Sequence, residues 1–204
     1  MRGLTDLTTG LDQILAEAGE RHGDRLVLLC SFQKEESVLV DSIARVAPRT
    51  RVVTIDTGVL FPETLATWRA FEQRYDVPIA VEDATGAWTG PEFCCGDAKV
   101  AALERALSGA EAWVTGIRRE QSPTRATADE VETDAKRGIA KYNPLAHWSD
   151  KDLWRVISER DLPYNPLHDQ GYDSIGCATC TQAGAGRAGR WAGTDKLECG
   201  LHVV

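Results

Sequence analysis

The 204-residue chain lacks long hydrophobic runs, an excess of positive charge and a glycine-rich phosphate loop. No apolar stretch approaches the roughly 18 residues of a transmembrane helix, so we expect no membrane partner. The first twenty residues carry four acidic side chains and no long apolar run, which argues against a Sec-type signal peptide and favours a cytoplasmic protein. Because the net charge is −8 and nucleic-acid binders are normally basic, we expect no nucleic-acid partner either.

The composition is that of an ordinary globular protein. Hydrophobic residues make up 43% and charged residues 26% of the chain, which argues against wholesale disorder. The length is that of a single domain with a real core, so disulfides are not required for folding. The six cysteines of a chain without a leader are therefore better read as thiols or metal ligands.

Hydrophobic periodicity divides most of the chain into alternating strands and helices. Alternation of this kind predicts an α/β fold with a mostly parallel sheet flanked by helices. The expected strands cover residues 25–31, 51–56, 78–82, 112–116 and 139–142, and the expected helices cover residues 4–20, 36–46, 62–75, 91–107 and 149–160.

The loops that follow the strands are the places to look for a ligand, because parallel sheets bind ligands beyond the carboxyl ends of their strands. These loops are residues 31–37, 56–61, 83–90 and 116–125. Periodicity ends near residue 162. We therefore expect a nucleotide-binding α/β unit over residues 1–165, with residues 166–204 forming an irregular tail packed on the same domain. The small-residue tract at 183–189 is typical of a mobile linker.

Four cysteines form two close pairs. Cys94 and Cys95 are adjacent and fall in the first turn of the helix expected from residue 91, where the helix dipole favours thiolates. Cys177 and Cys180 form a CxxC among small residues. Four thiolates suit either zinc or a cubane iron–sulfur cluster, and the spacing alone leaves both open. Cys30, inside an apolar strand, is better explained by core packing.

A fifth cysteine, Cys199, lies near the carboxyl end in the sequence ECGLH. Arg187 and Arg190 precede it and His202 follows it, and such cationic surroundings would stabilise a thiolate together with a bound anion. The loop at 31–37 has the position of a phosphate cradle, but it lacks glycine and is weak evidence by itself. The arginines within residues 115–125 are a candidate oxyanion site or a solvated surface.

Taken together, these motifs resemble the assimilatory adenylyl-sulfate reductases, within the wider adenylyl-sulfate and phosphoadenylyl-sulfate reductase family. The resemblance covers about residues 25–204, and the ECGLH ending is its most specific element. Paired cysteines of both kinds resemble the cluster-bearing subgroup that uses adenylyl sulfate. The segments that carry the resemblance are residues 31–39, 55–58, 61–64, 94–95 with Lys99, 115–125, 164–167, 177–180 and 198–202.

The resemblance implies an adenine-nucleotide α-hydrolase fold of the PP-loop type and a [4Fe–4S] cluster on Cys94, Cys95, Cys177 and Cys180. It implies that Cys199 attacks the sulfur of adenylyl sulfate, expels AMP and holds a thiosulfonate that thioredoxin releases as sulfite. Homo-oligomer formation is left open. The implied substrate-binding residues are Ser31, Phe32, Asp56, Thr57, Gly58, Lys99, Arg118, Arg187, Arg190 and His202.

Two departures from the family and three alternatives bear on this interpretation. The linker between the CxxC and Cys199 is short. The family's CCxxRK motif has Asp97 and Ala98 here, so an arginine beside the cluster is replaced. One alternative is a reductase of the 3′-phosphorylated substrate. Another is a zinc-stabilised nucleotide-binding module without redox turnover. An ATP pyrophosphatase is disfavoured, because the glycines of its phosphate loop are missing.

Overall fold

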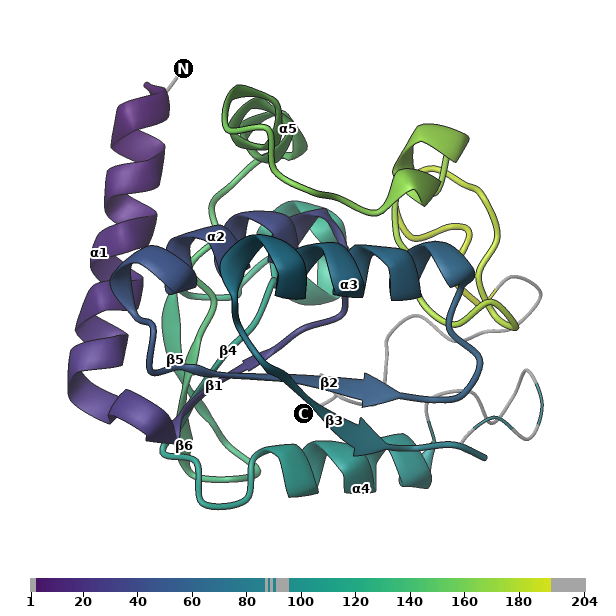
Figure 1. Ribbon diagram of the computed structural model, residues 1–204, viewed down its shortest axis with the longest axis horizontal. Helices are drawn as coiled ribbons and strands as arrows, with labels where there is room; N and C mark the ends of the chain where they lie inside the picture. The colour runs from purple at the N-terminus through teal and green to yellow at the C-terminus, as the bar shows by residue number, and fades with distance from the viewer. Residues whose placement is uncertain (1–2, 87, 89, 91–95, 192–204) are drawn as a thin grey trace.

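The computed structural model describes residues 3–86, 88, 90 and 96–191 of the chain. Six strands and five α-helices alternate over most of this part, with short 3-10 turns between them (Figure 1). The strands are β1 (Leu26–Leu29), β2 (Arg51–Asp56), β3 (Ile79–Asp83), β4 (Ala112–Val114), β5 (Val131–Asp134) and β6 (Ile139–Tyr142). The helices are α1 (Leu4–His22), α2 (Lys34–Val46), α3 (Pro62–Tyr75), α4 (Asp97–Ala106) and α5 (Asp150–Glu159).

The strands form one sheet in the order β3-β2-β1-β4-β6-β5. Every neighbouring pair is parallel except β5 and β6, which are antiparallel. The predicted mostly parallel α/β fold is therefore confirmed. From β1 the chain moves outward through β2 to β3, and it then resumes on the other side of β1 with β4. The strand order thus reverses between β1 and β4, which is where open α/β sheets bind ligands.

Helices cover both faces of the sheet. Alternate strand residues point to opposite faces, so Val27 and Trp113 pack with Leu103 of α4 on one face. Leu28 and Val114 pack on the other face with residues of α1, α2, α3 and α5. In Figure 1, α4 lies below the sheet and α2 and α3 lie above it. The central strands are buried on both faces, which explains their nearly continuous apolar sequences.

Local sequence signals set most helix starts. Pro62 begins α3, and Ser149 caps α5 by accepting a hydrogen bond from the Asp152 N–H at 3.2 Å, as expected. The continuous helix expected from residue 91 is wrong. Gly96 has extended backbone angles (φ −77°, ψ −158°) and caps α4, which begins at Asp97.

Strand β5 was not predicted from the sequence. Its four residues pair with β6 from Val131↔Tyr142 to Asp134↔Ile139. The strand is short and largely exposed at the sheet edge, with Val131 52% exposed, so it lacks the apolar run that marks the central strands. Strand β6 has the bounds that the periodicity predicted.

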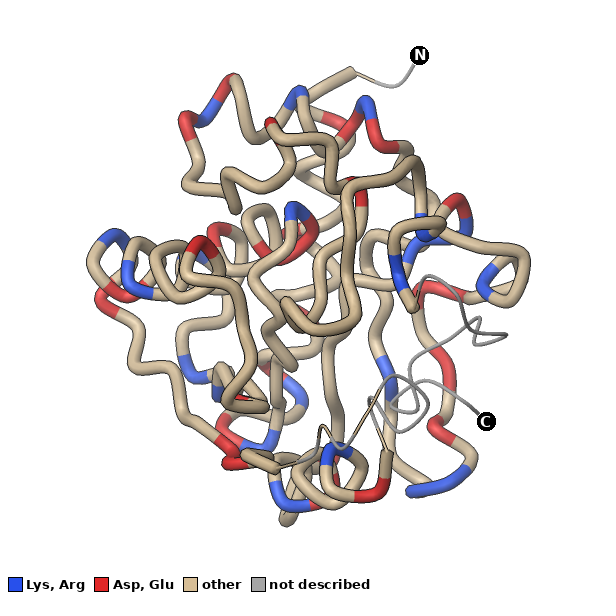
Figure 2. Tube along the Cα trace, turned by 90° about the vertical axis from the view of Figure 1, so that its right-hand side faces the viewer, with Lys and Arg blue, Asp and Glu red and all other residues tan. Residues whose placement is uncertain are grey.

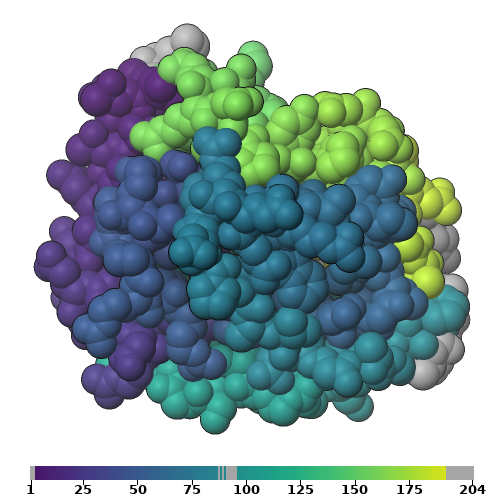
Figure 3. Space-filling view, viewed as in Figure 1, coloured from purple at the N-terminus to yellow at the C-terminus, as the bar shows by residue number. Residues whose placement is uncertain are grey.

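Residues 166–191 wrap over the carboxyl end of the sheet, at the upper right of the space-filling view (Figure 3). The small-residue tract 183–189 is not the free linker that its composition suggested. Gly184 N–H donates to the Gly171 carbonyl at 2.9 Å, and Gln182 N–H donates to the Gly189 carbonyl at 2.8 Å. Its glycines permit close backbone contact, because a Cβ on Gly189 would come within 2.0 Å of the Gln182 carbonyl oxygen.

Gly189→Ala is accordingly expected to destabilise the protein. The added methyl group would overlap backbone atoms, and overpacking of this kind costs about 1–3 kcal/mol. Urea unfolding of the purified variant measures the loss. Gly86→Ala is an unsuitable control because Gly86 has positive φ, whereas Gly10→Ala on α1 meets no atom within 4 Å. An unfolding free energy for Gly189→Ala equal to that of Gly10→Ala would contradict this packing.

Acidic and basic residues are interspersed along the chain in the view of Figure 2. Among the described helices, none combines the length and hydropathy that crossing a membrane requires.

Candidate active site

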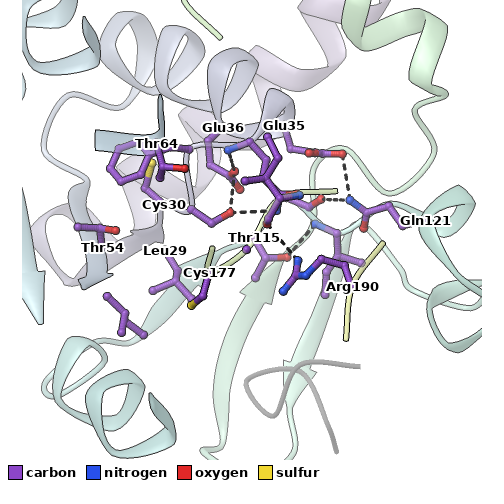
Figure 4. Close-up of a pocket in the computed structure, with 18 of the residues that line it drawn as sticks. Leu29, Cys30, Glu35, Glu36, Thr54, Thr64, Thr115, Gln121, Cys177 and Arg190 are labelled. Atoms are coloured by element: carbon purple, nitrogen blue, oxygen red, sulfur yellow. Dashed lines mark hydrogen bonds between the residues drawn. The ribbon is translucent and has the colours of Figure 1, made fainter. Parts of the chain in front are cut away.

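A cavity of about 120 Å³ opens at the strand-order reversal, beyond the carboxyl ends of β1 and β4. Leu29 to Gln33 line it from the β1 side, and Thr115 to Ile117 line it from the β4 side. Thr54 and Ile55 of β2 add a third strand end, and the 175–177 segment closes it from above. Figure 4 shows Thr115, Cys177 and Arg190 converging on this space. The topology thus places the cavity where the strand order predicted a ligand site.

The turn after β1 is built around a buried carboxyl group. Glu36 accepts hydrogen bonds through Oε2 from Ser31 Oγ at 2.9 Å and from the Gln33 N–H at 3.0 Å. Phe32 has a left-handed backbone (φ 58°), and its buried ring stacks on Trp68 with centroids 5.5 Å apart. A phenylalanine in this strained conformation needs such support from its surroundings. The predicted residues Ser31 and Phe32 both line the cavity.

Burial gives Glu36 an unusual proton affinity. Removal from water, followed by the nearby negative charge of Glu35, raises the pKa of Glu36 to about 8, although the hydrogen bonds from the turn oppose the shift. At pH 7 the Glu36 carboxyl is therefore mainly neutral. Sequence patterns do not reveal this pKa shift, because it depends on how deeply tertiary packing buries the first turn of α2.

Because its pKa is raised in the folded state, Glu36 makes stability fall as pH rises from about 4.5, its ordinary value, to about 8. Below this window both states are protonated, and within it only the unfolded state releases the proton freely. Glu36→Gln retains the accepting oxygen and removes the titration. Urea unfolding at pH 5 and pH 8 should show a smaller loss of stability in this variant than in wild type. The exposed Glu17→Gln is the control, and an unchanged loss in Glu36→Gln would refute the assignment.

Arg118 lies in a buried ion-pair network and not on the cavity wall. Its Nε donates to Glu35 Oε1 at 3.0 Å and its Nη2 donates to Asp150 Oδ1 at 3.1 Å. Lys34 Nζ lies 2.6 Å from the same Asp150 oxygen. Two carboxylates therefore balance two cations, and the network joins the starts of α2 and α5. This placement favours a structural role for Arg118 over the substrate contact that the resemblance implied.

Arg125, from the same arginine-rich loop, does line the cavity. Its Nη1 donates to Gln121 Oε1 at 2.5 Å, and Gln121 Nε2 donates to Glu35 Oε1 at 3.0 Å (Figure 4 draws the second bond). Arg125 is the last residue of the 3-10 turn Pro123–Arg125, which follows β4 in the chain. From the sequence, Arg125 was predicted only as one of the arginines within residues 115–125, since spacing does not reveal which of them lines a cavity.

Three predicted cations also line the cavity: Lys99, Arg187 and Arg190. Arg190 is 8% exposed, and its Nη1 donates to the Ile175 carbonyl at 3.0 Å. The Trp191 ring lies beneath both guanidinium groups, 5.3 Å from Arg187 and 4.6 Å from Arg190. Together with Arg125, these side chains give the cavity a cationic wall suited to an anionic ligand.

The CxxC segment forms part of the same wall. Cys177 lines the cavity and Cys180 N–H donates to the Cys177 carbonyl at 3.2 Å, which folds the four residues into a turn. Both cysteines are buried against Trp191. Thr57 Oγ1 lies 3.1 Å from Cys177 Sγ. Two thiols thus share one compact, largely apolar turn.

The loop after β2 supports this turn from below. Ala178 N–H donates to the Val59 carbonyl at 2.8 Å, and Leu60 bridges to Cys177. Asp56 Oδ1 accepts from the Gly58 N–H at 2.8 Å, which shapes the loop. The predicted residues Asp56, Thr57 and Gly58 are not among those lining the cavity. Of the three, Thr57 contacts the CxxC turn through Cys177.

Four predicted residues lie outside the described part of the chain: Cys94, Cys95, Cys199 and His202. Among the residues that the structure does describe, no three His, Cys, Asp or Glu side chains gather as metal ligands. The described set contains only two of the four predicted cluster cysteines.

Comparison with known proteins agrees with this geometry. Residues 25–183 match the family described as "Phosphoadenosine phosphosulfate reductase domain". The chain belongs to the phosphoadenosine phosphosulfate reductase family. The predicted family is thereby confirmed.

Relatives in the phosphoadenosine phosphosulfate reductase family have two kinds of name. "Adenosine 5'-phosphosulfate reductase" of Bacillus pumilus (strain SAFR-032) is 46% identical over 97% of this chain and 92% of its own length. "Phosphoadenosine 5'-phosphosulfate reductase" of Gloeobacter violaceus (strain ATCC 29082 / PCC 7421) is 43% identical over 94% of this chain and 88% of its own length. The crystal structure of phosphoadenylyl-sulfate (PAPS) reductase from Candida auris, a phosphate complex, has a TM-score of 0.72 with 28% identity, covering 84% of this chain and 90% of that one.

Proposed function

We propose that this chain reduces adenylyl sulfate to sulfite and AMP with thioredoxin as the electron donor. The observation that carries the proposal is the convergence of Cys177 with four cationic side chains on one cavity at the strand-order reversal. A nucleotide with an adjoining phosphate and sulfate requires such a site: a groove at the strand ends and cations beside it. The 46% identity to the Bacillus pumilus reductase supports the same substrate.

Different described residues are proposed to bind different parts of the substrate. Ser31 and Phe32, with Thr54 and Thr115 at the neighbouring strand ends, form the wall against which the adenosine would lie. The cationic side chains then hold the phosphate and sulfate and offset their charge. These are Lys99, Arg125, Arg187 and Arg190, and His202 is proposed to join them.

The proposed reaction begins at Cys199. Its thiolate attacks the sulfur of adenylyl sulfate, an S–S bond forms, and the bond from sulfur to the bridging phosphate oxygen breaks so that AMP leaves with the electron pair. A thiolate of reduced thioredoxin then attacks Cys199 Sγ and sulfite leaves with the S–S electron pair. The second thioredoxin thiol displaces Cys199, so thioredoxin ends as a disulfide and Cys199 as a thiolate.

The residues present fit an iron–sulfur cluster. Cys177 and Cys180 offer two thiols on one buried turn, and in sequence Cys94 and Cys95 precede Gly96, the residue that caps α4. We propose that these four cysteines hold a [4Fe–4S] cluster. When bound, such a cluster supplies an iron–sulfur centre tied to the cavity wall through its thiolate ligands. The chain's own contribution is to hold the CxxC turn through Thr57 and Val59.

Anaerobically purified protein with thioredoxin should form sulfite from adenylyl sulfate, and AMP should inhibit competitively because it fills the nucleotide part of the cavity. Initial rates at several AMP concentrations measure the competition. Absence of sulfite with adenylyl sulfate as substrate would refute the proposed function. AMP inhibition that is not competitive would move the nucleotide site elsewhere.

Reduction of the 3′-phosphorylated substrate is the second candidate. The Gloeobacter violaceus relative and the Candida auris structure are both named for that activity. A second phosphate requires an additional cationic contact, so parallel rates with both nucleotides distinguish the candidates. A kcat/KM higher for the 3′-phosphorylated compound would favour this second function.

A further inference from the structure

Gln33 connects two walls of the cavity that are far apart in sequence. Its Oε1 accepts a hydrogen bond from the Ile175 N–H at 2.7 Å and a weaker one from Ser174 Oγ at 3.4 Å. Its Nε2 donates to Ser31 Oγ at 3.3 Å, within the turn that Glu36 organises. The amide of Gln33 is therefore bonded at both its oxygen and its nitrogen, to the nucleotide-side turn and to the segment that precedes Cys177.

The connection continues from Ser174 to the cationic wall. Arg190 Nη1 donates to Ser174 Oγ at 3.3 Å and to the Ile175 carbonyl at 3.0 Å. Its guanidinium passes so close to Gly176 that a Cβ there would meet Nη2 at 2.5 Å. The two residues that accept from Arg190 are thus the two that donate to Gln33. The position of the guanidinium depends on where Gln33 holds these residues.

The other end of the same segment is anchored independently. Ala178 N–H bonds to Val59, and Thr57 contacts Cys177, both from the loop after β2. Loss of the Gln33 bonds therefore leaves the CxxC turn attached while releasing Ser174 and Ile175. Arg190, which donates to Ser174 and Ile175, is therefore the side chain whose position we expect to change.

We infer that Gln33 is a positioning residue, which sets the Arg190 guanidinium relative to the nucleotide-side turn and so aligns the anionic end of the substrate. The inference rests on the proposed function. Within that site, Gln33 keeps the nucleotide-side turn (residues 31–33) and the Arg190 guanidinium at a fixed distance from each other. A nucleoside without phosphate touches only one of these parts, whereas adenylyl sulfate spans both. Alignment by Gln33 should therefore matter for the sulfated nucleotide and not for adenosine.

Gln33→Met, which has similar length but neither bond, is expected to lower kcat/KM for adenylyl sulfate about tenfold, the usual effect of losing one well-placed hydrogen bond. The inhibition constant of adenosine should change less than twofold. Gln73→Met, at an exposed site on α3, is the matched control and should leave both unchanged. Equal losses for adenosine and adenylyl sulfate would make Gln33 a direct binding contact and overturn the inference.

A double-mutant cycle tests whether Gln33 acts through Arg190. Adding Gln33→Met to Arg190→Met should lower kcat/KM little further, because the group being positioned is already gone. Independent, multiplying losses would overturn the inference. Should Gln33→Met fail to fold, Ser174→Ala removes the hydroxyl between Gln33 and Arg190 and enters the same cycle.

Hydrogen exchange supplies a readout that does not depend on turnover. The peptide containing the Ile175 N–H should exchange faster in Gln33→Met than in wild type, while peptides from α5 stay unchanged. Gln33→Glu retains an accepting oxygen and should restore the protection. Unchanged exchange at Ile175 would refute the proposed connection, whereas absent sulfite formation in wild type would refute only the proposed function.

Discussion

Cys199→Ser is expected to abolish sulfite formation while leaving AMP binding intact. A serine hydroxyl is far less ionised than a thiol and a poorer nucleophile toward sulfur, so turnover should fall by roughly 10⁴-fold or more. The nucleotide wall is formed by residues at the ends of β1 and β4, and the substitution changes none of these residues. Sulfite release and equilibrium AMP binding, measured on one preparation, separate the two effects.

The covalent step has its own signature. Wild-type protein incubated with adenylyl sulfate and no reductant should gain one sulfonate group on the tryptic peptide that contains Cys199. Cys30 is the internal control, because it is 2% exposed and burial raises its thiol pKa well above the usual range. A sulfonate found on Cys30, or turnover without any adduct, would overturn the proposed mechanism.

Cys180→Ser should bleach the protein and eliminate sulfite formation. The variant removes one of four proposed thiolate ligands from a turn in which Cys177 and Cys180 are buried together. A serine oxygen is a poor substitute for thiolate in an iron–sulfur site. Iron and acid-labile sulfide content of anaerobically purified protein, with its visible spectrum, measures the effect.

Cys30→Ala is the matched control for this experiment, since Cys30 is buried near the cavity but is not a proposed ligand. It should retain iron and colour even if its stability falls. A fully coloured Cys180→Ser would exclude that cysteine as a ligand. Zinc without sulfide in the wild-type protein would instead support a zinc-stabilised module.

Most of the fold could be predicted because its information is local. Strand β2 and helix α3 have the predicted bounds: a β-branched run marks the first and Pro62 starts the second. Strand β5 was missed because it is short and exposed, and the start of α4 at Asp97 was missed because Pro91 offered an earlier helix start. Short edge strands carry weak periodic signals.

For the candidate site, the sequence predicted which kinds of residue are present but not which individual residues line the cavity. Sequence spacing identified a cationic loop, and the family resemblance implied Arg118 within it, which Glu35 and Asp150 hold in a buried network. Arg125 reaches the cavity instead. The Gln33–Ile175 bond joins residues 142 positions apart, so no local pattern contains it. Which partner a polar side chain finds is decided by tertiary packing.

The residues on either side of the 182–189 loop are bridged to each other, so this loop can change length with little effect on the rest of the protein. Thr181 and Arg190 are bridged, so the chain leaves and re-enters the body of the protein at nearly one point. At the tip, a Cβ on Gly186 would meet no atom within 4 Å. Extra residues inserted there would lengthen a loop whose ends are already joined, at little entropic cost. Residues can thus be added or removed at this tip during evolution while Cys180 and Trp191 keep the same distance from each other in space.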